Sequence, residues 1–239
     1  RLAFTFSTVG RICEAIPNLN YENVRRGIIG DSRIGRWGFY DSLFAGGSCL
    51  IKDAESISWQ LETHGARADF MRSVLAANRE QISHFLARAN NEAGFDFRGK
   101  TVALLGLAFK QDTNDMRHSG SIHVLEHVLA SGAASVRAWD PAAMDVCRTL
   151  FPQESGRNSI ISYTDSAETA IRGAECVIIA TDWPQFRTLG DTILESAARP
   201  CLVMDGRRMI ESQYQQLANA GMTVIAVGSP MLGPGTKTH

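Results

Sequence analysis

Residues 101–105 read TVALL, and a glycine follows directly at position 106. A short, continuously apolar run of this kind is typical of a strand that is buried on both faces of a parallel sheet. A helical pattern of apolar residues comes next, at positions 122, 125, 128 and 129, and Gly132 stands where helices commonly end. The stretch therefore predicts a strand, a turn and a helix, the repeating unit of a parallel α/β sheet.

The same alternation continues to the end of the chain. Further apolar runs predict strands at residues 135–139, 160–163, 176–180, 201–204 and 223–227. Helical patterns fall between them, at residues 143–150, 167–172, 190–198 and 211–220. We therefore expect an α/β fold with a Rossmann-like, doubly wound parallel sheet over residues 93–230, followed by a loose tail at 231–239.

The part before the sheet has a different character. Apolar residues recur every three or four positions over residues 68–91, which predicts one long amphipathic helix. Shorter helices are expected at residues 2–16, ending before Pro17, and at residues 53–63. Residues 27–48 are rich in glycine and lack a clear period, which indicates an ordered loop. Residues 1–92 are thus expected to form a helical domain.

Composition limits the class of protein. The 239 residues carry 24 Lys+Arg against 25 Asp+Glu, so a nucleic-acid or membrane-surface protein is not expected. No apolar run reaches the ~18–20 residues that a membrane-spanning helix needs. The five cysteines are widely spaced and form no CxxC pair, a pattern that favours reduced thiols and a cytoplasmic location.

The turn after the first predicted strand argues against a dinucleotide on this sheet. It reads GLAFKQ at residues 106–111, without the second and third glycines of G-x-G-x-x-G, although Asp140 ends the next strand, where a ribose-binding acid often stands. Lys110 and Arg117 place two cations at the carboxyl edge of the sheet, where such folds bind ligands. They favour an anionic ligand such as a sugar nucleotide diphosphate, unless both are simply solvated surface charges.

A cysteine stands in the most informative loop, GGSCLIKD at residues 46–53. Two glycines let another segment or a ligand approach the backbone, and Cys49 lies just before an expected helix start at Asp53, where backbone amides favour a thiolate. Lys52 adds positive charge. A thiolate there could attack an aldehyde while Asp53 orients or deprotonates a water. The alternative is that Cys49 is a small buried apolar residue, as Cys176 and Cys201 are expected to be.

One motif suggests a metal. Residues 123–127 read HVLEH, which matches the H-x-x-E-H pattern of some zinc proteases. The helix that carries it follows a sheet strand and has to pack on the sheet, and no third ligand is evident. We therefore expect no metal site.

Several motifs occur along nearly the whole chain: DSRIG at residues 31–35, GGSCLIKD at 46–53, GLAFK at 106–110 with Thr113, Asp115 and Arg117, TDW at 181–183, and DGRR at 205–208. Taken together, in this order, they resemble the UDP-glucose/GDP-mannose dehydrogenase family. The Asp-Gly-Arg element and the serine before the cysteine are most similar to the members that oxidise UDP-glucose.

The resemblance implies oxidation of a sugar C6 alcohol to a carboxylate with two NAD+, in which a cysteine holds the intermediate aldehyde as a thiohemiacetal and then a thioester. It makes Cys49 the nucleophile, Asp53 the helper acid or base, and Lys52 and Arg117 contacts of the cofactor. It implies a homodimer that packs through the helix at residues 68–91, with Arg33 reaching into the neighbouring site. The UDP-sugar would be held by Arg33, Phe39, Tyr40, Gly46, Phe109, Lys110 and Arg207.

The chain also departs from the family pattern. In the family an NAD-binding domain precedes these motifs, so we expect the sequence to be the C-terminal portion of a longer dehydrogenase. Ser42, Phe44 and Ala45 stand where many members have glycines and an aromatic residue, and His118 and Gly120 replace a common glutamate and proline. Two alternative functions stay open. The chain could be a non-catalytic module that binds UDP-sugar and dimerises, or part of a GDP-mannose-type dehydrogenase.

Overall fold

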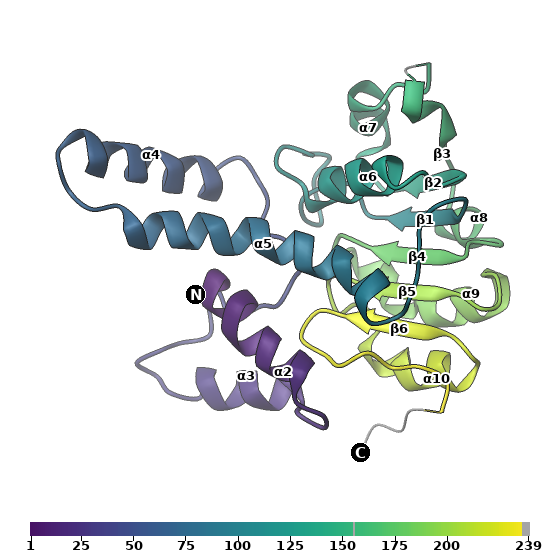
Figure 1. Cartoon of the computed structure of the whole chain (residues 1–239), viewed down its shortest axis with the longest axis horizontal. Helices are drawn as coiled ribbons and strands as arrows, with labels where there is room; N and C mark the ends of the chain where they lie inside the picture. Colours follow the sequence, from purple (N-terminus) through teal and green to yellow (C-terminus); the bar gives the residue numbers. More distant parts are fainter. Residues whose placement is uncertain (155, 236–239) are drawn as a thin grey trace.

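The computed structural model describes residues 1–154 and 156–235; the last part of the expected tail, residues 236–239, lies outside the described residues. Six strands form one parallel sheet in the order β3-β2-β1-β4-β5-β6 (Figure 1). This is the Rossmann order, and the order reverses between β1 and β4, the place where such sheets bind ligands. The predicted sheet is confirmed. Its strands are β1 (Thr101–Leu105), β2 (Ser135–Trp139), β3 (Ile161–Tyr163), β4 (Cys176–Ile179), β5 (Leu202–Asp205) and β6 (Thr223–Ala226).

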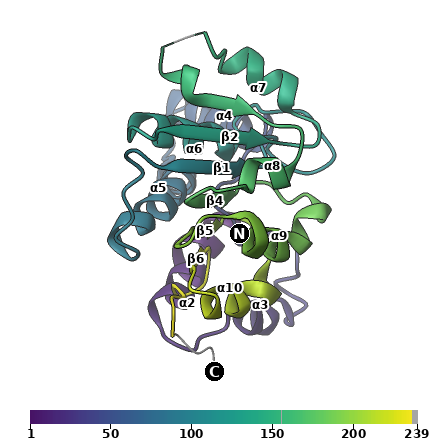
Figure 2. The same cartoon turned by 90° about the vertical axis from the view of Figure 1, so that its right-hand side faces the viewer.

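Helices cover both faces of the sheet (Figure 2). Along β1, Val102 and Leu104 face one core while Ala103 and Leu105 face the other, because side chains alternate along a strand. Both sets are completely buried, which explains why the strand is apolar at every position from Val102 to Leu105. The first core is covered by α5 (Asp69–Asn91), α6 (Gly120–Ala130) and α7 (Met144–Leu150), and the second by α8 (Ala167–Ile171), α9 (Leu189–Ser196) and α10 (Tyr214–Asn219).

The segment before the sheet is helical, as expected. One helical run consists of α1 (Leu2–Phe4), the π-helical η1 (Thr5–Gly10) and α2 (Arg11–Ala15). A hairpin of α4 (Leu50–Thr63) and α5 extends away from the sheet (Figure 1). The start of α4 lies three residues before the predicted one, so Cys49 is the N-cap residue of this helix.

One helix was not predicted. Residues of α3 (Tyr21–Ile29) include the start of the stretch expected as a glycine-rich loop. The helix is capped by Asn20, whose side chain accepts a hydrogen bond from the backbone N–H of Asn23 at 2.9 Å. Glu22 in its first turn further favours a helix start, since acidic groups are stabilising there.

A buried arginine joins the helical segment to the sheet. Arg88 of α5 is 2% exposed and donates hydrogen bonds to the carbonyls of Ala226 and Ser229, both at 2.8 Å. Its charge is balanced by Glu14 of α2 at 3.1 Å and by Glu92 at 2.7 Å. Because a buried guanidinium needs all of these partners, the contact fixes α2 and α5 against the end of β6.

The start of the expected tail is attached to the sheet. Leu232 is buried, and its backbone exchanges hydrogen bonds with Val224 of β6 at 2.7 and 2.9 Å. The segment after Gly228 therefore pairs antiparallel with the edge strand instead of hanging free. Of the helices in residues 1–154 and 156–235, none combines the length and apolar character needed to cross a membrane.

Candidate active site

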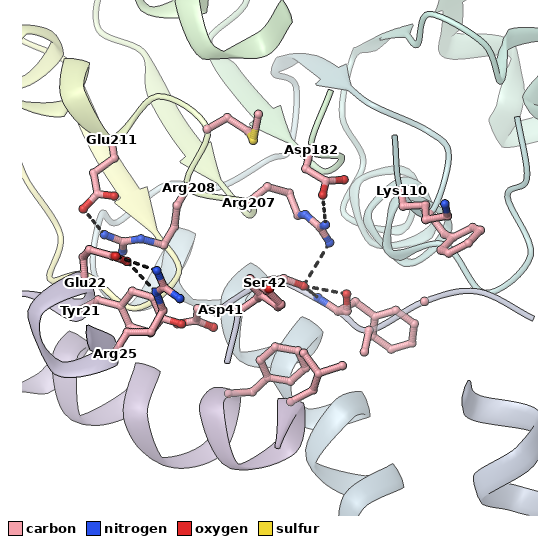
Figure 3. A pocket seen from close by; sticks show the side chains of 18 of the residues that line it. Tyr21, Glu22, Arg25, Asp41, Ser42, Lys110, Asp182, Arg207, Arg208 and Glu211 are labelled. Carbon is pink, nitrogen blue, oxygen red and sulfur yellow. Dashed lines mark hydrogen bonds and ion pairs between the residues drawn. The ribbon is translucent and has the colours of Figure 1, made fainter. Parts of the chain in front are cut away.

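A cavity of about 740 Å³ lies at the carboxyl ends of β1, β4 and β5, next to the point where the strand order reverses (Figure 3). Its other walls come from the helical segment, namely from η1, α3 and the loop that precedes Cys49. Ligands of open α/β sheets bind at this edge. The cavity is therefore the candidate substrate site.

Five of the seven residues expected to hold the substrate line this cavity: Tyr40, Gly46, Phe109, Lys110 and Arg207. Two lie elsewhere. Phe39 is 5% exposed and packs edge-on against Phe4, so it belongs to the core of the helical segment. Arg33 is exposed, forms an ion pair with Asp31 at 2.6 Å and does not line this cavity.

The two glycines before Cys49 allow a close approach between the cysteine loop and the loop after β1. A Cβ at Gly47 would lie 2.7 Å from the ring of Phe109, and Gly47 also has a φ of +96°, which other residues adopt only with strain. A Cβ at Gly46 would collide with the carbonyl oxygen of His118. The diglycine therefore lets the cysteine loop pack against Phe109; Gly46 and Leu50 line the cavity, whereas Cys49 between them is not among the lining residues.

Cys49 is exposed, whereas the other four cysteines are buried, and all five are free thiols. The Cys49 sulfur lies 3.8 Å from the Ser48 hydroxyl. Asp53 stands one helical turn further, and its carboxylate pairs with Lys52 at 3.2 Å. Of the five thiols, Cys49 is therefore the one that a molecule from solution can reach.

Arg117, the second of the two cations expected to contact the cofactor, interacts electrostatically with the Cys49 thiol. Arg117 is exposed and forms an ion pair with Asp115 at 2.8 Å. The hydrogen bonds from Arg117 to Asp115 raise the pKa of the guanidinium, and the charge of Cys49 adds a smaller rise. Arg117 therefore lies within electrostatic range of Cys49.

Gly120 allows a close approach between the start of α6 and the loop before Cys49. A Cβ at Gly120 would collide with the side chain of Leu43 and lie 3.1 Å from the Cβ of Phe44. The absence of a side chain at Gly120 therefore leaves room for Leu43 of the neighbouring loop.

Most charges in the cavity are paired. Arg25 pairs with Glu22 at 2.7 Å, and Arg208 pairs with Glu211. Lys110 and Arg187 also line the cavity, and within the described residues neither has an acidic partner. These two cations are available to an anionic ligand.

Arg207 connects the two halves of the cavity wall. Its guanidinium pairs with Asp182 at 2.8 Å and donates a long hydrogen bond of 3.4 Å to the Ser42 hydroxyl (Figure 3). The other oxygen of Asp182 accepts from the backbone N–H of Gln111 at 3.3 Å. The loops after β1, β4 and β5 and the cysteine-bearing loop are therefore tied together around one guanidinium.

The turn after β1 is already occupied by a side chain. One carboxylate oxygen of Asp140 accepts from the backbone N–H groups of Leu107 and Ala108 at 2.6 and 3.1 Å and from the Trp183 indole at 3.0 Å. The other accepts from the backbone N–H groups of Ala142 and Ala143, both at 2.8 Å. The amides that would cradle a pyrophosphate thus bind Asp140, so this turn does not fit a dinucleotide.

The two histidines of the HVLEH motif pack against aromatic rings. His123 lies edge-on to Phe44 at 5.1 Å between ring centroids, and His127 lies edge-on to Phe97 at 5.6 Å. Burial lowers the pKa of His127. In the part of the chain that the structure describes, no three His, Cys, Asp or Glu side chains gather as a metal site would require.

Sequence reasoning did not assign Asp182, Arg187 or Asp41 to the site, although all three line the cavity. Asp182 and Arg187 follow β4, and polar residues after a buried strand are a recognisable signal for the ligand-binding edge of the sheet. No such signal exists for Asp41, because its place in the cavity depends on how the helical segment packs against the sheet.

Two models of one family match the chain. The central domain of the UDP-glucose/GDP-mannose dehydrogenase family matches residues 3–80, and its UDP binding domain matches residues 103–212. UDP-glucose 6-dehydrogenase of Pseudomonas aeruginosa is 32% identical over 219 residues, covering 92% of this chain and 48% of that protein. UDP-glucose 6-dehydrogenase YwqF of Bacillus subtilis is 30% identical over 226 residues, covering 95% of this chain and 49% of that protein.

Solved structures agree with this assignment. The structure of a UDP-glucose dehydrogenase from Pyrobaculum islandicum matches with a TM-score of 0.77 at 26% identity, covering 96% of this chain and 48% of that one. The chain spans about half the length of the curated relatives it matches. It belongs to the UDP-glucose/GDP-mannose dehydrogenase family, of which it carries the central domain and the UDP binding domain.

Proposed function

We propose that this chain binds a UDP-sugar, UDP-glucose in particular, and supplies the nucleophilic thiol of a nucleotide-sugar 6-dehydrogenase. The observation that carries the proposal is the single cavity that joins the cationic edge of the sheet to the loop bearing Cys49. The names of the curated relatives support UDP-glucose as the substrate. The match of residues 103–212 to a UDP binding domain supports the nucleotide part.

The cavity offers a place for each part of such a ligand. Gly46, Leu50 and Phe109 line the end next to Cys49, and the sugar belongs there because its C6 has to meet the thiol. Lys110 and Arg187 provide the unpaired positive charge for the diphosphate, and Arg207 lies nearby. The opposite end, formed by α3 and the segment after β5, is left for the nucleoside.

Cys49 is the proposed nucleophile that bonds covalently to the sugar aldehyde. It is exposed at a helix N-terminus, and its thiolate would add to the aldehyde carbon at C6 to give a thiohemiacetal. After oxidation to the thioester, water would release the acid and regenerate the thiol. Asp53, on the same face of the helix one turn away, is the proposed acid or base for that water.

NAD+ is the hydride acceptor that the family resemblance implies. The turn after β1 does not fit it, because Asp140 occupies the backbone amides there. The cofactor has to be held elsewhere than on this sheet, with Lys52 and Arg117 as proposed contacts beside Cys49. By itself, the chain is therefore expected to bind UDP-glucose without oxidising it.

We further propose that two copies associate through the α4–α5 hairpin. The hairpin projects from the sheet (Figure 1). It also exposes large apolar side chains. Ile57, Trp59 and Phe70 are 47%, 65% and 78% exposed. Exposed aromatic side chains such as these are enriched at protein interfaces. In the dimer, Arg33 would reach the site of the neighbouring copy.

Calorimetry tests the binding proposal directly. The chain is expected to bind one UDP-glucose per molecule, in competition with UDP. Lys110→Ala and Arg187→Ala should each weaken UDP binding about 10- to 100-fold at low salt, since each removes a charge-assisted contact to phosphate. The losses should shrink as ionic strength rises.

A matched control is Arg148→Ala, which removes an arginine of α7 that pairs with Asp145 and does not line the cavity. It should leave UDP affinity unchanged. Equal affinity in all three variants would refute the diphosphate assignment, and NADH formation by the chain alone would refute the conclusion that this sheet holds no cofactor.

A further inference from the structure

Two buried polar side chains interrupt the apolar face of α5 beside the loop that precedes Cys49. Asn78 and Gln81 lie on the same face of the helix as Ile82 and Phe85, since residues three, four and seven positions apart share a face. They are 8% and 1% exposed. A buried amide costs free energy unless it is hydrogen-bonded, so the partners of these two side chains indicate what they do.

Asn78 binds the backbone of one residue of that loop through both ends of its amide. Its Oδ1 accepts from the N–H of Ala45 at 2.8 Å, and its Nδ2 donates to the carbonyl of Ala45 at 3.0 Å. Ala45 lines the candidate substrate cavity and is the last residue before the diglycine. Asn78, which is not among the lining residues, therefore holds the cavity wall from the side of α5.

The loop is held on two sides. On the side of α5, Gln81 donates a further hydrogen bond to the carbonyl of Ser42 at 3.0 Å, while its Oε1 has no partner among the described residues. On the side of the sheet, the N–H of Leu43 donates to the carbonyl of Gly206 at 2.8 Å. Asn78 thus contributes two hydrogen bonds to the loop and Gln81 one.

The diglycine makes such an anchor necessary. Gly46 and Gly47 can adopt more backbone conformations than other residues, so they do not by themselves fix the direction of the chain. After them the chain is held because Cys49 is the N-cap residue of α4. Before them it is held because Asn78 binds Ala45. The two anchors together determine where Gly46 lies in the cavity wall and where the thiol lies next to it.

We propose that Asn78 is a positioning residue for the cysteine loop. By pairing with both polar groups of the Ala45 backbone, it keeps Gly46 in the cavity wall and Cys49 next to the sugar end of the cavity. It acts through Ala45 and does not touch the ligand. The inference rests on the proposed function, in which the sugar lies beside the thiol.

Amide hydrogen exchange of the chain without ligand tests the contact itself. Asn78→Ala removes both hydrogen bonds, so exchange in the segment 42–48 should rise about 10- to 100-fold. The strands β1 and β4 should stay within about threefold of the wild type. Unchanged exchange in 42–48, or an equal rise in the strands, would overturn the proposal, because the first shows no contact and the second a general loss of stability.

Calorimetry on Asn78→Asp tests the effect on the site. The carboxylate has the same size but no donor, so it repels the Ala45 carbonyl, and UDP-glucose should bind about tenfold more weakly than to the wild type at about pH 8. UDP should bind within about twofold of the wild type, since the loop adjoins only the sugar end. Asn90→Asp, the same change at an exposed position of α5, should alter neither affinity.

Lowering the pH should rescue Asn78→Asp. Burial raises the pKa of a carboxyl group, and the protonated acid again offers one donor and one acceptor. At about pH 5 the ratio of the variant and wild-type dissociation constants for UDP-glucose should therefore return to within about threefold. Asp41 and His123, which packs against Phe44 of the loop, are present in both proteins, so their titration cancels in this ratio. This comparison holds even if Asn78→Ala does not fold.

The outcomes separate this inference from the proposed function. UDP-glucose affinity of Asn78→Asp equal to that of the wild type at about pH 8, or a loss that persists undiminished at about pH 5, would overturn the role of Asn78 and leave the proposed function intact. A wild-type chain that binds no UDP-glucose would overturn the proposed function and, with it, the positioning role. In that case the exchange data would still show whether Asn78 holds the loop.

Discussion

On the proposed function, Cys49→Ser should lower formation of the sugar acid by a factor on the order of a thousand or more in a protein that joins this chain to an NAD-binding domain, while UDP-glucose affinity is retained. A hydroxyl is a far weaker nucleophile than a thiolate at neutral pH, so the covalent aldehyde intermediate would not form. The substitution leaves the charged wall of the cavity intact, which is why binding survives. Product formation and calorimetry on the same preparation measure the two effects.

Cys201→Ala provides the matched control. Cys201 is 2% exposed and belongs to the buried interior beside β5, so its replacement should leave turnover within about twofold of the wild type. Acid formation by Cys49→Ser at close to the wild-type rate would remove Cys49 from the mechanism. A loss of UDP-glucose binding in that variant would instead show that the thiol supports the site structurally.

The largest expected effect on stability is that of Asp140→Asn. The native carboxylate accepts five N–H donors in a site that is 1% exposed, and an amide group would turn its own donors toward some of them. The free energy of unfolding should fall by about 3–5 kcal/mol, because several buried donors lose a charged acceptor at once. Urea denaturation followed by circular dichroism measures the change.

Asp145→Asn is the control for that experiment. Its side chain is 97% exposed and pairs only with Arg148, so the unfolding free energy should change by less than about 0.5 kcal/mol. A change below about 1 kcal/mol in Asp140→Asn would mean that the turn after β1 does not depend on this carboxylate. That result would reopen the turn as a place for an external anion.

Much of the sheet could be predicted because its strands are buried on both faces. TVALL and the later apolar runs are typical of buried strands, and their alternation with helices leaves a parallel α/β sheet as the expected fold. The helix α3 was missed, although Asn20 and Glu22 carry a recognisable start signal, because the glycines that follow dominated the interpretation. The start of α4 at Leu50 was predicted late, since Cys49 is not among the preferred N-cap residues.

Some residues of the candidate site could be predicted from the sequence and others could not. Lys110 could be placed at the ligand edge because residues that follow parallel strands gather there, whereas Phe109 and Arg207 were expected in the site through the family resemblance. Asp182, which pairs with Arg207, and Arg187, which has no acidic partner among the described residues, follow β4 at the same edge. Only the contacts reveal which of these charges are already neutralised. Asp41 could not be found, because nothing in its neighbouring sequence indicates that the carboxyl group is buried.

The rate at which iodoacetamide alkylates Cys49 tests the central claim most directly, because Cys49 is the one exposed cysteine among five, all of which lie in the described part of the chain. If the sugar end of the cavity adjoins the thiol, UDP-glucose at ten times its dissociation constant should slow alkylation about tenfold. UDP at the same occupancy should slow it less than about twofold, since the sugar end then stays open. Alkylation that proceeds at an unchanged rate while UDP-glucose is bound would contradict the account.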